Sequence, residues 1–160
     1  MSMLALPESE CQEILALFRQ HLPHVPDDWQ QELAGNYRQD AVVDIDPNDV
    51  IDILSVPGEQ HRIQTLLTEE EPLEKIYSRL CDALEARGID QQQISASLLM
   101  IHDSSAKLAE IGNLVQRVAV EYGDSVKKGW AWYRSMHLDT PKRLVWVVAI
   151  NVPSNSDLLE

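Results

Sequence analysis

The spacing of apolar and polar residues predicts a mostly helical chain through its first two thirds. Apolar side chains recur every three or four positions over 7–22, 70–87 and 106–122, which places them on one face of a helix in each segment. A further helix is predicted to begin near Asp27, where acidic residues suit a helix N-terminus. Gly88 follows the helix over 70–87, as expected just beyond a helix C-terminus.

The stretch between the second and third of these helices mixes signals. Asp46 and Pro47 suit the N-cap and first-turn positions, so we predict a short helix over 48–54. Residues 41–45 are a candidate for a short strand. Another short helix is predicted from three apolar residues, Ile63, Leu66 and Leu67.

The C-terminal third changes character because β-branched residues become frequent. Five of the nine residues over 144–152 are Val or Ile, whose branched side chains favour a strand. The segments 91–101 and 126–138 each fit a helix or a strand, and we favour a helix for the first. Residues 138–143, LDTPKR, suit a hairpin loop, although Thr140 and Pro141 would equally suit the start of a last helix.

These elements predict an α+β fold, mostly helical, with a C-terminal β-hairpin packed on the helices; an all-α fold is the close alternative. A chain of 160 residues that is 44% hydrophobic can bury a core without metals or disulfides. We expect a single globular domain over 1–153 and a frayed tail over 154–160.

Charge is unevenly distributed along the chain, whose net charge is −13. The first 110 residues hold 21 acidic and 7 basic side chains, and the remaining residues hold 5 and 6. An acidic protein repels phosphate backbones and anionic membrane surfaces, so we expect neither direct nucleic-acid binding nor membrane binding.

No apolar run reaches the roughly 18 residues of a membrane span, and the first residues do not resemble a secretory signal. We therefore expect a cytoplasmic protein in which Cys11 and Cys81 are reduced and buried.

Two acidic or histidine-rich segments resemble metal sites incompletely. In the segment DIDPND, the residues Asp44, Asp46 and Asn48 match the first alternating ligands of a calcium loop. The sixth and twelfth positions are Asp49 and Ser55, which supply neither the glycine nor the bidentate glutamate of such a loop. The segment HLPHVPDD contains two histidines and two aspartates, but its prolines prevent a continuous helix and no second ligand cluster accompanies it. We predict no metal and no other cofactor.

Residues 102–105, HDSS, contain a base, a carboxylate and hydroxyl groups. Adjacency along the chain does not make a catalytic triad, and no Gly-x-Ser-x-Gly elbow surrounds either serine. A helix N-cap is the favoured interpretation of the serines. A small hydrolase or transferase that uses His102 and Asp103 remains an alternative function.

The segment 126–148 gathers three of the four tryptophans and five basic residues. Trp, Tyr and Arg are enriched at interaction hot spots, and the basic residues would form a positive island that complements an acidic surface. For Trp130 and Trp132 core packing is favoured, with a partner surface as the alternative. The candidate interaction site comprises Lys127, Lys128, Trp130, Trp132, Tyr133, Arg134, Lys142 and Arg143.

The resulting hypothesis is a small acidic, non-enzymatic interaction module with a regulatory role, as an adaptor, chaperone-like factor or inhibitor. Its partner would be another protein, a second copy of the chain included, which would make it a homo-oligomer. The second alternative to this function is a nucleic-acid mimic that inhibits a DNA-binding partner, because the chain is strongly acidic.

Overall fold

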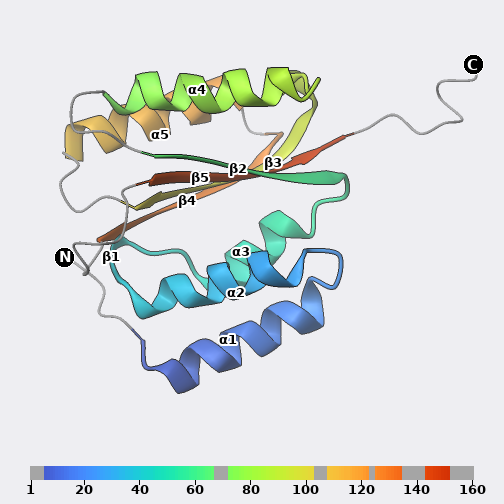
Figure 1. The fold of residues 1–160 in the computed structure, drawn as a ribbon, viewed down its shortest axis with the longest axis vertical. Coiled ribbons are helices and arrows are strands. Elements are labelled where there is room, and N and C mark those ends of the chain that lie inside the picture. The colour runs from blue at the N-terminus through green and yellow to red at the C-terminus, as the bar shows by residue number, and fades with distance from the viewer. Residues whose placement is uncertain (1–5, 67–71, 103–107, 123–124, 135–142, 152–160) are drawn as a thin grey trace, which may run out of the picture.

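A five-stranded mixed sheet lies between two layers of helices, so the fold is α+β (Figure 1). This computed structural model describes residues 6–66, 72–102, 108–122, 125–134 and 143–151. The helices of one layer are α1 (Glu8–His21), α2 (Asp27–Gly35) and α3 (Pro47–Leu54), and those of the other are α4 (Leu73–Ala86) and α5 (Leu108–Tyr122). The strands are β1 (Asp40–Val43), β2 (Glu59–Leu66), β3 (Ile94–His102), β4 (Lys127–Arg134) and β5 (Arg143–Ile150).

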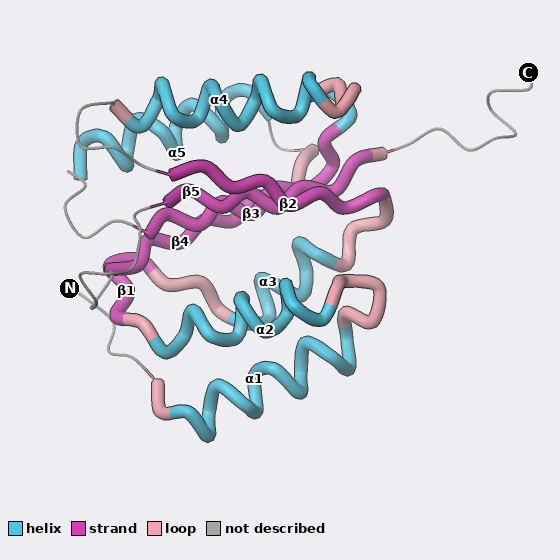
Figure 2. Tube along the Cα trace, in the orientation of Figure 1, coloured by secondary structure: helices cyan, strands magenta, loops and turns pink. Residues whose placement is uncertain are grey.

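The strands follow the order β1-β4-β3-β5-β2, with β3 and β4 parallel and the other neighbours antiparallel. Each face of the sheet carries its own apolar core, one beneath α1–α3 and the other beneath α4 and α5. Figure 2 shows these two groups of helices on opposite sides of the sheet. Successive side chains of a strand point to opposite faces, so the central strands contribute to both cores. Within β4, Ala131 and Tyr133 join the core under α1–α3, whereas Trp132 joins the core under α4 and α5.

The amphipathic helices were predicted correctly in type. The helices over 7–22, 70–87 and 106–122 correspond to α1, α4 and α5, and the short helix after Asp46 is α3. The Asp46 carboxylate accepts a hydrogen bond from the Asn48 backbone N–H at 2.8 Å, with proline at the first turn, as the sequence predicts. Gly88 follows α4 with φ of +78°, a conformation that favours glycine.

Three expectations about the strands were wrong. Residues 94–102 form β3 rather than a helix, because the strand is central and nearly every side chain is buried on one face or the other. Residues 59–66 form β2 rather than including a short helix, and they pair along their whole length with β5. The two C-terminal strands do not form a hairpin, because β3 lies between β4 and β5. The all-α alternative is excluded by the same sheet.

Cys11 and Cys81 are free thiols buried on α1 and α4, and burial raises the pKa of each. In the described ranges the helices are too short or too polar to cross a membrane. The predicted hairpin loop and the predicted tail fall almost wholly within 135–142 and 152–160, outside the described residues.

Candidate functional site

Strand β4 is covered by a neighbour on its outer side along only part of its length. Its inner side pairs with β3 from Lys127 to Tyr133. On its outer side the pairs with β1 begin at Trp132 and end at Arg134. Among the described residues, no strand pairs with the outer side of 127–131. We call 127–131 the open segment of β4, and 132–134 its covered segment.

The open segment exists because the chain leaves the sheet edge soon after β1 begins. The pairing with β4 is irregular between Ala41 and Val43, and the strand ends there. Asp44 then accepts a hydrogen bond from the Ile45 backbone N–H at 2.9 Å, and Pro47 begins α3. The chain therefore passes beneath the sheet, where the Ile45 side chain is buried.

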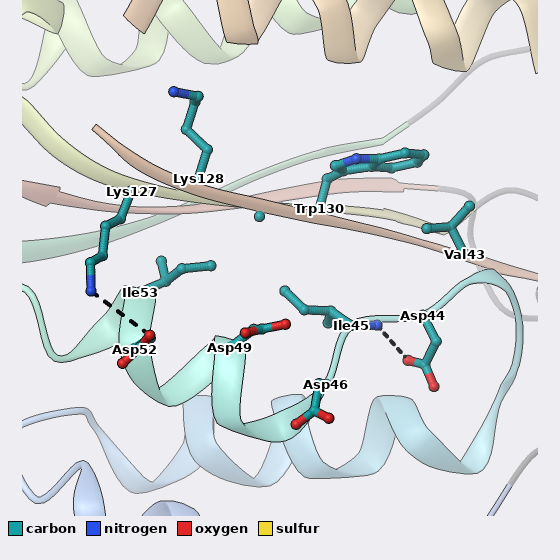
Figure 3. Close-up of a pocket in the computed structure, with 11 residues that line it drawn as sticks. Val43, Asp44, Ile45, Asp46, Asp49, Asp52, Ile53, Lys127, Lys128 and Trp130 are labelled. Carbon is teal, nitrogen blue, oxygen red and sulfur yellow. Dashed lines mark hydrogen bonds and ion pairs between the residues drawn. The ribbon is translucent and has the colours of Figure 1, made fainter. Parts of the chain in front are cut away.

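A depression of about 390 Å³ lies between α3 and the open segment, on the face of the sheet covered by α1–α3 (Figure 3). We call it the acidic pocket, because four carboxylates line it, those of Asp44, Asp46, Asp49 and Asp52. Lys127 reaches from β4 toward α3, and its Nζ lies 3.8 Å from the Asp52 carboxylate in an exposed ion pair. Burial raises the pKa of Asp44, and the nearby charge of Asp46 raises it further.

Gly129 allows α3 to approach the strand at the bottom of this pocket. A Cβ atom at position 129 would lie 2.5 Å from Ile53 Cδ1 and 2.8 Å from Ile45 Cδ1. These distances are shorter than any ordinary contact between carbon atoms. The glycine thus leaves room for the ends of the Ile45 and Ile53 side chains against the open segment.

A smaller depression of about 180 Å³ lies on the opposite face of the open segment, against α5. We call it the apolar pocket, because it is lined by Leu99, Val115, Val118 and Ala119 together with Lys128, Gly129 and Trp130. In Figure 3, Lys128 and Trp130 point away from the acidic pocket, toward this second face. The open segment is therefore flanked by a charged pocket on one face and an apolar pocket on the other.

The structure divides the predicted interaction residues. Lys127, Lys128 and Trp130 lie on the open segment, and their side chains are exposed or half-buried. Trp132 and Tyr133 lie in the covered segment and are 5% and 1% exposed. Lys142 and the Arg134 side chain fall outside what the structure describes, whereas Arg143 is half-buried on β5, which lies on the far side of β3.

The structure places acidic groups beside Lys127, one member of the expected positive island. Lys127 points into the acidic pocket, which four aspartates line, so this pocket carries more negative than positive groups. The aspartates were noticed in the sequence as an incomplete calcium loop. Their position against β4 depends on a contact between segments about 75–85 residues apart, which no local pattern records.

His102, the base in the alternative catalytic hypothesis, is fully buried at the end of β3. Its ring stacks on Tyr133 with centroids 5.1 Å apart, and Nδ1 lies 3.3 Å from the Gln39 side-chain oxygen. Burial, together with smaller contributions from the positive charges of Arg143 and Arg62, lowers the pKa of His102 to about 3. The imidazole is thus neutral at pH 7 and a weak general base. Asp103 and both serines lie outside the described residues.

The described part of the chain contains no group of three His, Cys, Asp or Glu side chains arranged to hold a metal ion. In the segment HLPHVPDD, one histidine nitrogen already has a backbone partner, because His24 Nε2 contacts the Leu54 carbonyl oxygen at 2.7 Å. Asp27 of the same segment forms an ion pair with Arg19 at 2.9 Å.

Comparisons with known proteins identify the fold and nothing finer. No protein-family model matches the sequence, and no curated protein sequence is significantly similar to it. The structure is similar to an empty FtsZ dimer from M. jannaschii, with a TM-score of 0.59, 17% identity, and coverage of 83% of this chain and 42% of that chain. A tryptophan-to-tyrosine mutant of the same FtsZ gives a TM-score of 0.59, 15% identity, and coverage of 83% and 43%. The chain thus spans less than half the length of the FtsZ chains, and the likeness at this identity is one of fold alone.

Proposed function

We propose that this chain is a non-enzymatic protein-interaction module that binds its partner along the open segment of β4. The observation that supports this most directly is the strand edge over 127–131, which has no neighbouring strand among the described residues. An edge without a neighbour presents backbone N–H and C=O groups to another chain, and proteins commonly use such edges for recognition.

The surroundings of the edge favour a protein partner over other classes. Trp130 supplies a half-buried aromatic surface, which is typical of interaction hot spots. The acidic pocket and the net charge of −13 disfavour phosphate-bearing ligands. The two pockets add shape and charge at which a partner's side chains could be distinguished. An adaptor or inhibitor acting in the cytoplasm fits these features, and the free buried thiols agree with a reducing compartment.

Site-specific photo-crosslinking tests the proposal. A photoreactive amino acid replaces Lys127 in one variant and Glu85, an exposed residue of α4, in a control. In an extract of the source organism we expect a discrete crosslinked protein with the label at 127 and none with the label at 85. Equal crosslinking at both positions, or none at 127, would refute the proposed surface.

A further inference from the structure

We infer that the partner contributes an extended peptide, with basic and apolar side chains in alternation, that adds to the sheet as a strand beside the open segment of β4. This inference rests on the proposed function and specifies the chemistry of the partner. It follows from the edge itself, from the two pockets that flank it, and from the arrangement of charge around it.

The alternation follows from the geometry of a strand. Side chains of a strand point alternately to its two faces, and a strand added to the edge of a sheet obeys the same rule. Along the open segment, Lys127 points toward the acidic pocket, and Lys128 and Trp130 point toward the opposite face. A peptide paired with this edge would therefore direct every second side chain to the acidic pocket and the others to the apolar pocket.

The lining of each pocket specifies what it accepts. The aspartates of the acidic pocket outnumber its two lysines, and the Lys127–Asp52 ion pair is exposed and 3.8 Å long, so it is readily exchanged. A Lys or Arg side chain of the peptide would complement the remaining carboxylates. On the other face, Leu99, Val115 and Val118 form a surface that favours Val, Leu or Ile. The five residues of 127–131 extend over roughly 16 Å, which matches a peptide core of about five residues.

The other sheet edge is less suited to the same partner. Strand β2 also has no neighbouring strand on its outer side among the described residues. Its polar side chains already have partners, because Arg62 forms an ion pair with Glu32 at 2.6 Å and His61 Nε2 lies 2.8 Å from a Glu59 carboxylate oxygen. A peptide with basic side chains would have to compete with these existing contacts.

A second copy of the chain would complement the open segment poorly. A two-fold pairing of two β4 edges would bring both acidic helices to the same face of the joined sheet, where like charges repel. Residues 152–160 of the chain carry two acidic and no basic side chains, so they do not supply the predicted charge either.

Binding of designed peptides to the intact protein provides the test. The first peptide alternates Lys and Val over nine residues, the second arranges the same residues in two blocks, and the third replaces every Lys of the first with Asp. Fluorescence anisotropy of labelled peptides measures the affinity. We expect the alternating peptide to bind at least about tenfold more tightly than the block peptide, and the Asp peptide not to bind.

Backbone methylation separates strand addition from simple charge attraction. In an added strand the amides point alternately toward β4 and toward solvent. Methylating one alternate set of amides should abolish binding, whereas methylating the other set should leave binding nearly unchanged. Equal effects of the two sets, or equal binding of the alternating and block peptides, would overturn the inference.

Two protein variants locate the pockets. Ala119→Arg fills the apolar pocket and should weaken binding about tenfold or more, whereas Gln116→Arg, on the exposed side of the same helix, should not. Asp49→Asn combined with Asp52→Asn should also weaken binding, while Asp82→Asn with Glu85→Gln on α4 should have little effect. If the control variants weaken binding as much as the pocket variants, the inferred site is wrong.

The outcomes distinguish this inference from the proposed function. If no peptide binds but the label at 127 captures a partner, the interaction surface remains and strand addition is refuted. If sedimentation instead reveals a dimer of the chain that the Ala119→Arg change dissociates, a second copy occupies the edge, and the inference of a basic peptide is wrong.

Discussion

Trp130 and Trp132 point to the same face of β4 and lie only two residues apart, yet their surroundings differ. Trp132 is 5% exposed and belongs to the core under α4 and α5, whereas Trp130 is half-buried at the edge of that core. The difference is the neighbouring strand, because β1 pairs with the covered segment and not with the open one. The two tryptophans thus differ in burial because of β1, a strand that lies about 90 residues earlier in the sequence.

The same contrast extends to the polar groups of the two segments. The covered segment contacts the buried ring of His102, which stacks on Tyr133 and is neutral at pH 7. The open segment contacts exposed ionised groups, those of Lys127 and Asp52. The covered segment of β4 therefore belongs to the buried core, and the open segment belongs to the surface at which we propose a partner binds.

The largest expected difference between the two segments is in stability. Trp132→Ala should lower the free energy of unfolding by about 3–5 kcal/mol, because a buried indole leaves a large cavity. Trp130→Ala should cost less than about half as much, since its ring already contacts solvent. Urea denaturation followed by circular dichroism measures both values. Equal losses of unfolding free energy would mean that pairing with β1 does not make the two tryptophan positions different.

The pH dependence of the free energy of unfolding tests whether His102, beside the covered segment, is buried in its neutral form. His102 has a folded pKa of about 3 and an unfolded pKa near 6.5, so the unfolded chain binds the extra proton between these values. The contribution of His102 to the free energy of unfolding is complete above pH 6.5. Below that pH it falls by roughly 1.4 kcal/mol per pH unit, so that about 2.7 kcal/mol is lost at pH 4.5. Urea titrations at pH 7 and 4.5 measure the loss. His102→Gln should reduce it by this amount, whereas His21→Gln, which alters an exposed histidine, should not.

The helices were predictable because their signals are local. Apolar stripes, the Asp46–Pro47 pair and Gly88 each act within one or two turns, and each occurs in the structure where expected. Strand β3 was misread for an equally physical reason. Helices cover both faces of β3, so its residues 98–101 are all apolar and lack the alternation that identifies a half-buried strand.

The strand order and the candidate site were less accessible to sequence reasoning. Nothing in the pattern of 126–150 indicates that β3 lies between β4 and β5, because pairing partners depend on long-range packing. The sequence shows the concentration of Lys127, Lys128 and Trp130, but the aspartates that lie near Lys127 come from α3 and the loop before it. Charge counted along the chain therefore does not reveal that carboxylates lie around Lys127 in this pocket.

A smaller effect is expected from the glycine that brings α3 close to the open segment. Gly129→Ala should lower the free energy of unfolding by about 1–2 kcal/mol, because the new Cβ displaces the ends of the Ile53 and Ile45 side chains. Gly112→Ala in α5 meets no atom within 4 Å and should raise stability by about 0.5–1 kcal/mol, since alanine favours a helix. Thermal unfolding of the two variants gives both changes. A Gly129→Ala protein as stable as the wild type would show that the acidic pocket can widen without cost.

The smallest change in stability is expected at Lys127, and it separates folding from binding. Lys127→Glu breaks an exposed ion pair with Asp52 and should change the free energy of unfolding by less than about 1 kcal/mol. The same change makes the acidic pocket more negative, so the alternating Lys and Val peptide should associate faster at low salt, and the gain should fade at higher ionic strength. Stopped-flow association measures this rate, with Lys75→Glu on α4 as a control that changes the net charge equally. If both variants accelerate association to the same extent, the total charge of the protein attracts the peptide and the open segment of β4 does not direct it.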